Sequence, residues 1–368
     1  MDQRNVTESS EYMEFQNHVH SLIGKGRVPS LSIAVTRHDG LVHSSSFGYA
    51  DLSSRKLATP GTQYLWFSIS KVVTATAVLK LADEGLIDLT APISEYIPSY
   101  VSKNGNNQPT VGQLLNHTAG VANPMPIRWV HPTGDSNFDS RGFLERQLER
   151  NGKPKYPVGQ GGRYSNLGYL ILAEIVNQAS KVKFEEYVRQ QILRPIGMVN
   201  TDYVYGEGLD QAVGYVRMPR LVAPIFKALL PKGVVGERHG DFQSLQPFLV
   251  NGVGYGGLVG DVVEAARFAA LHLSDGMGDG KRILSSETVR SMRQIQTPGK
   301  PFNFGLAWFR KSINSEPEFV EHYGGGAGFF NVMRLYPGLD QGIVLMANTT
   351  TAYDFETLFN LLIKVPWN

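Results

Sequence analysis

Apolar positions at the start of the chain follow first a helical and then a strand-like spacing. Residues 11–23 carry apolar side chains three and four positions apart, which predicts a helix. Residues 30–36 and 41–48 are strand-like, and the polar sequence His38-Asp39-Gly40 separates them. This pattern predicts an antiparallel hairpin directly after the first helix.

The middle of the chain has the pattern of a helical region. Residues 68–82 are rich in small and aliphatic side chains, with Val72, Ala75 and Leu79 on one face, and the stretch ends before Gly85. Further helical patterns are separated by Gly and Pro residues. They cover residues 111–115, 167–178, 184–193, 262–273 and 287–294.

Short strand-like segments return in the last hundred residues and are followed by a closing helix at 355–363. The predicted strands are 305–309, 318–323, 329–336 and 342–347. Strands at both ends with helices between them predict an α+β fold, in which an antiparallel sheet is flanked by helices and a helical region is inserted into it. We expect residues 1–67 and 251–368 to form a discontinuous sheet domain and residues 68–250 a helical domain, with an active site at their boundary.

Composition narrows the possible functions. The chain has 368 residues, of which 42% are hydrophobic and 18% charged, so it can bury a large core. The formal charge of +2 argues against nucleic acid as a partner. The absence of cysteine excludes disulfides, thiolate metal sites and a cysteine nucleophile.

The compartment is inferred from two further absences. No run of 18 apolar residues occurs, so no membrane span is predicted. The polar and charged start, Met1 to Glu14, lacks the pattern of a signal peptide, and we therefore expect a cytoplasmic protein.

Three S-x-x-K sequences are the remaining nucleophile candidates, because G-x-S-x-G, H-E-x-x-H and P-loop motifs are absent. Ser53/Lys56 lies in a polar turn and Ser180/Lys183 at a frayed helix end. Ser68/Lys71 lies where the aromatic stretch 64–67 leads into a helix. This position is the one where a hydroxyl can be buried and activated.

Ser68 and Lys71 lie one helical turn apart, so the amine can reach the hydroxyl. An amine beside apolar surface has a lowered pKa and can accept the serine proton, while the amide of Ser68 can donate to an oxyanion. The alternative is a helix-capping serine with a surface lysine.

Two further motifs contain candidate site residues. Tyr164-Ser165-Asn166 can present a phenol and an amide on one side; Tyr164, held as a phenolate near a lysine, would share the base role, and Asn166 would bind Lys71 or the substrate. The alternative is a helix start with a core tyrosine.

In His322-Tyr323-Gly324-Gly325-Gly326, the amide of Gly325 would complete an oxyanion hole. The alternative there is a glycine-rich turn.

The order and spacing of these motifs resemble the serine β-lactamase-related family, which contains class C β-lactamases, D-amino-acid peptidases and β-lactamase-like carboxylesterases. The similarity covers about residues 28–348. Other stretches similar to that family are Leu114–Gly120, Tyr164–Tyr169, Leu193–Met198, Gly256–Asp261 and Phe304–Trp308.

The resemblance implies a β-lactamase or penicillin-binding-protein fold and a role for each motif. Ser68 would be acylated, Lys71 and Tyr164 would transfer protons, and Asn166 would position Lys71 and the substrate. His322, Tyr323 and Gly324 stand where penicillin-binding enzymes carry Lys-Thr-Gly. A histidine with a reference pKa of about 6.5 is mostly neutral at pH 7, and Tyr323 would narrow the site. Both changes favour neutral esters.

Several other residues are given structural interpretations. His117 is expected to be buried and hydrogen-bonded, and His131, His239 and His272 lack ligand spacing, so no metal is predicted. Trp308 is expected near the site, while the other tryptophans are expected in the core. The mixed apolar and basic segment 216–250 is expected to form a lid or wall of the acyl pocket.

The sequence therefore predicts a serine hydrolase that forms an acyl-enzyme on Ser68 and needs no cofactor. Its partner is a small-molecule ester or amide, with short-chain carboxylic esters favoured. A β-lactam or a D-amino-acid peptide or amide is the alternative substrate, and a non-catalytic binding protein of this fold is the alternative from another class. The oligomeric state is left open.

Overall fold

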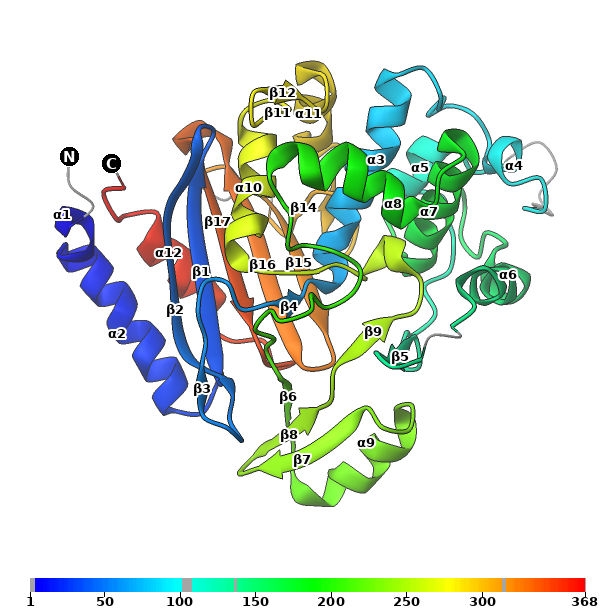
Figure 1. The fold of residues 1–368 in the computed structure, drawn as a ribbon. Helices are drawn as coiled ribbons and strands as arrows, with labels where there is room; N and C mark the ends of the chain where they lie inside the picture. The colour runs from blue at the N-terminus through cyan, green and yellow to red at the C-terminus, as the bar shows by residue number, and fades with distance from the viewer. Residues whose placement is uncertain (1–3, 101–107, 136–137, 313–315, 368) are drawn as a thin grey trace.

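An eight-stranded antiparallel sheet forms the centre of the molecule (Figure 1). The computed structural model describes residues 4–100, 108–135, 138–312 and 316–367. The strand order in the sheet is β13-β14-β15-β16-β17-β1-β2-β3. The strands are β1 (Ser30–Arg37), β2 (Gly40–Asp51), β3 (Lys56–Leu57), β13 (Asn303–Phe304), β14 (Phe309–Arg310), β15 (Val320–Gly326), β16 (Phe329–Tyr336) and β17 (Gln341–Ala347).

The two ends of the chain meet in this sheet, because β1 pairs antiparallel with β17 and places Ile33 opposite Leu345. The α+β prediction and the N-terminal hairpin are thus confirmed. The strand expected at 305–309 is wrong. β13 ends at Phe304 and β14 begins at Phe309. Between them, Ala307 has a φ of 70° and donates its N–H to Leu115 O, which is incompatible with an extended strand.

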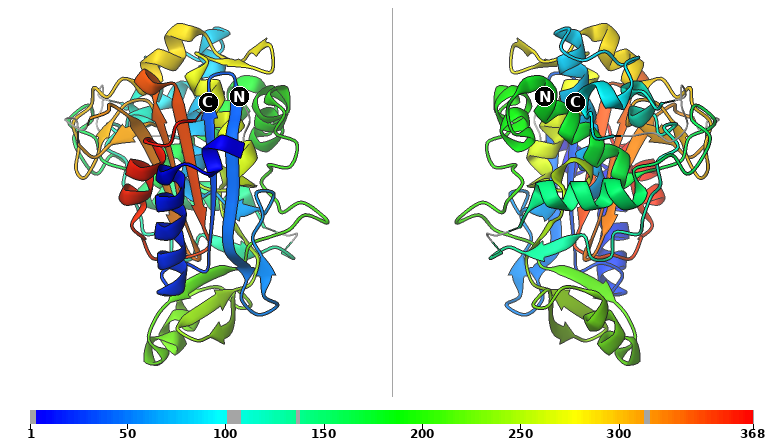
Figure 2. Two further views of the ribbon diagram at one scale, coloured as in Figure 1. Left: turned by 90° about the vertical axis from the view of Figure 1, so that its left-hand side faces the viewer. Right: turned by 90° about the vertical axis from the view of Figure 1, so that its right-hand side faces the viewer.

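Helices cover both faces of the sheet. On one face lie α2 (Ser10–Gly24) and α12 (Phe355–Leu362), and on the other lies α10 (Val262–Leu273) (Figures 1 and 2). The alternation of side chains along β1 explains the two layers. Leu31, Ile33 and Val35 belong to the core with α2 and α12, whereas Ala34 belongs to the larger core on the other side.

The helical region is built around α3 (Ser70–Asp83), which packs against α7 (Asn166–Ser180). Every residue of α3 from Ser70 to Leu79 is buried. The expectation of one apolar face therefore understated its burial, because α3 is surrounded on all sides. The charged helix α6 (Ser140–Asn151) was not predicted; Phe143 is its one buried residue.

A small lobe projects from the body at the bottom of Figure 1. Its three-stranded sheet has the order β6-β8-β7, with β6 (Gly214–Arg217), β7 (Val235–His239) and β8 (Phe242–Leu245). Between β6 and β7 lie the short turn η4 (Arg220–Val222) and helix α9 (Ala223–Leu229). β9 (Phe248–Val250) leads back to the body, where it pairs with β5 (Val130–Pro132).

The remaining elements are short connections between these layers. The strands are β4 (Tyr64–Leu65), β10 (Val259–Gly260), β11 (Met277–Gly278) and β12 (Lys281–Arg282). The helices are α1 (Arg4–Thr7), α4 (Ile93–Tyr96), α5 (Val111–Leu115), α8 (Phe184–Val188) and α11 (Ser286–Arg293). The short 3-10 helices are η1 (Phe67–Ile69), η3 (Arg194–Ile196), η5 (Val253–Tyr255) and η6 (Pro337–Leu339), and η2 (Arg189–Leu193) is a π-helix. The division of the chain into two domains at residues 67 and 250 stays a prediction.

Candidate active site

Ser68 lies in the turn η1, between β4 and α3. The preceding residue, Phe67, has a φ of 49°, a left-handed conformation that bulky side chains rarely adopt. Phe67 and Ile69 are buried, whereas Ser68 is partly exposed. The turn therefore holds the hydroxyl at a fixed place where a substrate can reach it.

Lys71 lies one turn after Ser68 and is fully buried. Its Nζ is 3.0 Å from Ser68 Oγ, 2.8 Å from Asn166 Oδ1 and 2.7 Å from the backbone oxygen of Tyr255. The amide oxygen and the backbone oxygen can only accept, so each takes an N–H of the amine. The third contact is the serine hydroxyl.

Burial lowers the pKa of Lys71 well below its usual range. Three aromatic rings approach Nζ, with centroids at 4.8 Å (Tyr164), 5.6 Å (Tyr169) and 5.3 Å (Tyr255), and such rings favour the ammonium form. Loss of hydration is the larger effect in this fully enclosed position. Burial therefore favours the neutral form of the amine, which has a lone pair that can face Ser68.

Tyr164 immediately precedes the N-cap of α7 and hydrogen-bonds to Ser68. Its ring lies 4.8 Å from that of His117. Burial raises the pKa of Tyr164 above its usual range, more than the bond to Ser68 lowers it. The raised pKa contradicts the expected phenolate, because burial removes the hydration that a negative charge needs and the bond to Ser68 offsets only part of that loss.

Asn166 is the first residue of α7, and two neighbours fix its orientation. Its side-chain oxygen accepts from Lys71, and its backbone N–H donates to Asn123 Oδ1 at 3.0 Å. Ser165, between Tyr164 and Asn166, caps the helix by accepting from Gly168 N and donates to Ala122 O, so its hydroxyl is used locally.

His322 on β15 is buried, with its ring centre 6.3 Å from that of Tyr164. Its Nδ1 lies 2.8 Å from the carbonyl oxygen of Tyr323, so Nδ1 carries the hydrogen and donates it. Burial, with a smaller contribution from Lys71, lowers the pKa of His322 to about 3. Nε2 has no hydrogen-bond partner among the described residues, which leaves a buried acceptor beside Tyr164.

Tyr323 points away from this cluster. Its hydroxyl donates to Glu321, and its ring packs 5.4 Å from Phe355 of α12, on the other face of the sheet. Neighbouring residues of a strand face opposite sides, so His322 and Tyr323 cannot both face Ser68. The expectation that Tyr323 narrows the site is wrong.

Gly324 and Gly325 have different surroundings. A Cβ at Gly324 would overlap the carbonyl oxygen of Trp66, so β15 lies directly against the chain entering η1. Gly325 is exposed, and a Cβ there would come 3.3 Å from the Phe330 ring. Among the described strands, β14 pairs with β15 only at Glu321, which leaves the outer edge near Gly325 unpaired.

The other sequence candidates have local partners. Ser53 donates to Asp51 and Ser180 donates to Val176 O. The buried position predicted for His117 is confirmed: its Nδ1 accepts the N–H of Ser165 at 3.2 Å. Trp308 was expected near the site but is fully buried against His272, with ring centres 5.3 Å apart.

Sequence reasoning missed two contributors, the carbonyl of Tyr255 and the side chain of Asn123. Tyr255 immediately precedes the Gly256–Asp261 stretch that is similar to the β-lactamase-related family. A role carried by a backbone oxygen leaves no side-chain signature, although this motif marks the region.

A pocket of about 360 Å³ adjoins the cluster and includes Tyr164 in its lining. It contains three cationic side chains and no acidic one: Lys155, Arg163 and Lys300. The Arg163 guanidinium lies 4.3 Å above the Tyr156 ring. These cations give this side of the site a positive charge.

A serine, a buried lysine whose pKa is lowered and a tyrosine, held between a helical layer and an antiparallel sheet, define a candidate acyl-transfer site. The Beta-lactamase family model matches residues 15–363, and the chain belongs to this family of serine hydrolases. Within the described residues, no helix has the length and apolar character needed to cross a membrane.

Among curated relatives, protein flp of Staphylococcus aureus is 27% identical over 197 residues, which is 52% of this chain but 38% of flp. Penicillin-binding protein 4 of Amycolatopsis lactamdurans is 26% identical over 364 residues, 94% of this chain and 88% of that protein.

Solved structures share the fold at low identity. The octameric penicillin-binding protein homologue from Pyrococcus abyssi has a TM-score of 0.79 at 21% identity, and the match covers 96% of this chain and 77% of the homologue. The D-amino acid amidase from Ochrobactrum anthropi has a TM-score of 0.75 at 20% identity, and the match covers 99% of this chain and 98% of the amidase. A class C beta-lactamase has a TM-score of 0.73 at 17% identity, and the match covers 98% of this chain and 99% of that enzyme.

Proposed function

We propose that this protein hydrolyses short-chain carboxylic esters through an acyl-enzyme on Ser68. The observation that carries the proposal is the arrangement around Lys71. Asn166 and the carbonyl of Tyr255 occupy its two N–H groups, and the lone pair remains for Ser68 Oγ at 3.0 Å. A neutral amine placed in this way is a general base for the serine.

In the first step, Ser68 Oγ attacks the ester carbonyl while its proton passes to Lys71. The developing oxyanion accepts hydrogen bonds from the amides of Ser68 and Gly325. The register of β15 supports this use of Gly325. Gly326 pairs with Phe329 across a two-residue turn, so alternate residues bond to β16 and Gly325 directs its N–H to the unpaired edge.

Collapse of the tetrahedral intermediate releases the alcohol. Tyr164, neutral and hydrogen-bonded to Ser68, gives its proton to the leaving oxygen and takes one from the ammonium of Lys71. Both groups then return to their neutral forms. In deacylation a water molecule replaces the alcohol, gives its proton to the same pair, and the acid leaves as Ser68 recovers its hydrogen.

The preference for neutral esters rests on His322. Burial lowers the pKa of His322 to about 3, so it carries no charge where the resemblance places a lysine cation. Its free Nε2 can accept a hydrogen bond but cannot pair with a substrate carboxylate. Uncharged acyl esters therefore fit this strand better than β-lactams do.

One observation favours the alternative substrate class. The pocket beside Tyr164 carries Lys155, Arg163 and Lys300 without an acidic residue. A β-lactam or D-amino-acid amide with a carboxylate on that side would find cations there. A neutral ester would be bound beside the uncharged His322, whereas a substrate with a carboxylate would direct this group to the cationic pocket.

The test compares p-nitrophenyl acetate, p-nitrophenyl butyrate, nitrocefin and a D-alanyl p-nitroanilide, with Ser68→Ala as control. Ester turnover that disappears in the variant supports the proposal. If nitrocefin or the D-amide is turned over faster than the esters, the substrate is a β-lactam or a D-amino-acid amide instead. A fluorophosphonate probe that fails to label Ser68 would show a non-catalytic binding protein instead.

A further inference from the structure

The helix of the projecting lobe exposes its aliphatic side chains to solvent. None of the residues of η4 and α9 is buried. Leu221 is 91% exposed and Ile225 is 62% exposed, and Val222 and Leu229 are also exposed. Apolar residues grouped on one exposed helix are unusual on a protein surface and mark a contact with something else.

These side chains form one stripe along the helix. Leu221, Ile225 and Leu229 are spaced by four residues, which places them one above another. The helix is attached to the body by other residues, because Leu230 is buried in the main core and Phe226 packs against it. The stripe is thus not needed to hold the lobe in place.

A second segment adds to the same apolar surface. Arg128 bonds to the last carbonyls of α9, those of Ala228 and Leu229, at 3.4 and 3.3 Å. In the loop that ends at Arg128, Met125 is 76% exposed and Ile127 is also exposed. Two chain segments therefore present apolar side chains beside each other.

The lobe is also cationic. No Asp or Glu occurs between Asp210 and Glu237, whereas Arg217, Arg220, Lys227 and Lys232 lie in this interval. Arg217 pairs with Asp241 at 3.4 Å, and the other three form no ion pair among the described residues. Because a helix is about 10 Å across, which is about one Debye length, these charges act on anything that the stripe contacts.

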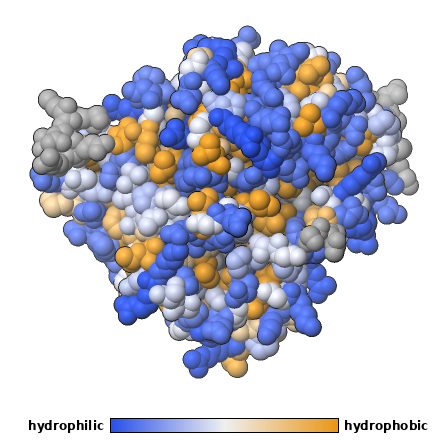
Figure 3. All heavy atoms as spheres, in the orientation of Figure 1, coloured by the Kyte–Doolittle hydropathy of each residue, from blue (hydrophilic) through white to orange (hydrophobic). Residues whose placement is uncertain are grey.

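We propose that this lobe docks on the surface of an anionic phospholipid bilayer, with the aliphatic stripe entering the boundary between headgroups and acyl chains. Exposed aliphatic residues combined with an excess of Lys and Arg are the features that such surfaces bind. A second copy of the chain fits less well, because a two-fold contact through this lobe would bring the cations of both copies together. Figures 1 and 3 show the lobe projecting from the lower end of the molecule, with apolar and polar residues mixed on the face in view.

The experiment measures flotation of the full chain with vesicles of pure phosphatidylcholine and with vesicles containing phosphatidylglycerol. The wild type should float with the anionic vesicles only. Leu221→Asp/Ile225→Asp should bind at least ten-fold more weakly. The matched control Leu57→Asp/Val199→Asp changes two exposed aliphatic residues in other parts of the chain and should bind like the wild type.

The charge contribution is tested with Arg220→Gln/Lys227→Gln, which should weaken anionic-vesicle binding roughly five-fold per charge removed. Sedimentation velocity on the same proteins tests the alternative, in which a second copy of the chain contacts the aliphatic stripe. A wild type that self-associates, and is made monomeric by Leu221→Asp/Ile225→Asp, overturns the proposal in favour of a second copy. Equal flotation of the wild type and the stripe variant also overturns it. Ser68→Ala should bind the anionic vesicles like the wild type. A failure of the docking proposal can therefore be distinguished from a failure of the proposed esterase activity.

Discussion

Among the described residues, no carboxylate contacts Lys71: the groups around its nitrogen are a hydroxyl, an amide oxygen, a backbone carbonyl and three aromatic rings. Burial therefore determines its protonation state. Below its lowered pKa the amine becomes an ammonium and loses the lone pair that faces Ser68. The rate constant kcat/KM should therefore fall as pH is lowered through this pKa.

Replacing Lys71 with arginine tests its role as a base. A guanidinium stays protonated at any working pH, so Lys71→Arg should lower kcat by about 10²–10⁴-fold. The matched control is Lys80→Arg in the same helix, where the amine pairs with Glu84 near the surface. Steady-state kinetics with p-nitrophenyl butyrate measure both. Activity retained in Lys71→Arg contradicts the assignment of Lys71 as the base.

Replacing Asn166 with aspartate tests the electrostatic argument without changing the shape of the side chain. The carboxylate of Asn166→Asp would lie 2.8 Å from Lys71 Nζ and favour the ammonium, which raises the pKa of Lys71. The acid limb of the kcat/KM profile should move to higher pH by about 1–3 units. A limb that does not move would mean that another group titrates in this profile.

At the residue scale, the sequence predicted the contact between Ser68 and Lys71 because a helix places residues three apart on one face. It could not predict the neutral state of Tyr164, which depends on burial among His117, Lys71 and neighbouring rings that are distant in the sequence. It also could not show that the Tyr323 side chain lies on the α12 face of the sheet.

At the scale of elements, the position of β15 against η1 depends on a glycine. A Cβ at Gly324 would overlap the backbone of Trp66, which cannot move without displacing Ser68. Gly324→Ala should therefore lower stability by several kcal/mol and abolish esterase activity. At Gly325 the new Cβ meets only the Phe330 ring at 3.3 and 3.5 Å, so Gly325→Ala is the matched control and should fold normally. Urea unfolding and ester turnover check both; equal stability of the two variants contradicts this account.

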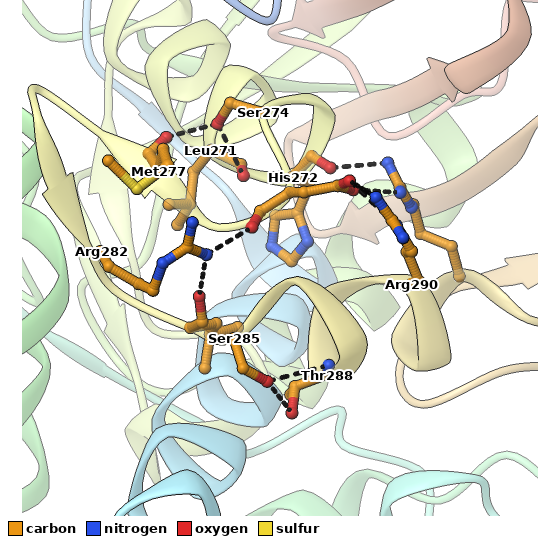
Figure 4. A network of polar contacts seen from close by, with 11 residues as sticks. Leu271, His272, Ser274, Met277, Arg282, Ser285, Thr288 and Arg290 are labelled. Carbon is orange, nitrogen blue, oxygen red and sulfur yellow. Dashed lines mark hydrogen bonds and ion pairs between the residues drawn. The ribbon is translucent and has the colours of Figure 1, made fainter.

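A polar network fixes the connection between α10 and α11 (Figure 4). Asp275 Oδ2 lies 2.6 Å from Arg290, and Oδ1 lies 2.8 Å from Arg293, which also donates to His272 O. Asp275 has a φ of 51°, which asparagine tolerates. Asp275→Asn therefore removes the charge without straining the backbone.

We expect Asp275→Asn to lower the free energy of unfolding by about 1–2 kcal/mol, because two charge-assisted interactions weaken. The control is Asp279→Asn in the β11–β12 hairpin that follows, where φ is 50° and the side chain forms no ion pair with a described residue. Urea unfolding of both variants is the measurement. Equal stability of Asp275→Asn and the wild type would show that solvent already screens the network.

The elements that the sequence predicted best have strong local periodicity. The predicted bounds of α10 and β16 match the structure, and the two-sided alternation of β1 follows its pattern. Prediction failed for Gly305–Trp308, whose conformation depends on the distant contact between Ala307 and Leu115. It also missed α6, because a helix with a single buried residue has little apolar periodicity.

At the scale of the whole molecule, buried histidines link stability to pH. Burial lowers the pKa of His272 and of His322 to about 3. The unfolded chain protonates such groups below about pH 6.5, while the folded chain does not until about pH 3. Each therefore destabilises the fold progressively as pH falls through this range. Asp261 has the opposite effect, because burial raises its pKa to about 6 and the folded chain therefore binds this proton more tightly than the unfolded chain does. As pH falls from about 6 to the ordinary pKa of an aspartate, Asp261 stabilises the fold.

The contribution of one histidine can be isolated with His272→Leu, since His272 contacts Trp308 and Phe268 and has only a long contact of 3.4 Å with Thr76. Urea unfolding between pH 6 and 5 should show a stability slope smaller by about 1.4 kcal/mol per pH unit in the variant.

His38 is the control, because its pKa is shifted in the opposite direction from that of His272. Its bond to Asp340 raises its pKa, so its stabilisation is present at low pH and is lost as pH rises. His38→Ala should therefore steepen the loss of stability on acidification, and a His272→Leu slope equal to that of the wild type would mean that His272 takes up protons without unfolding.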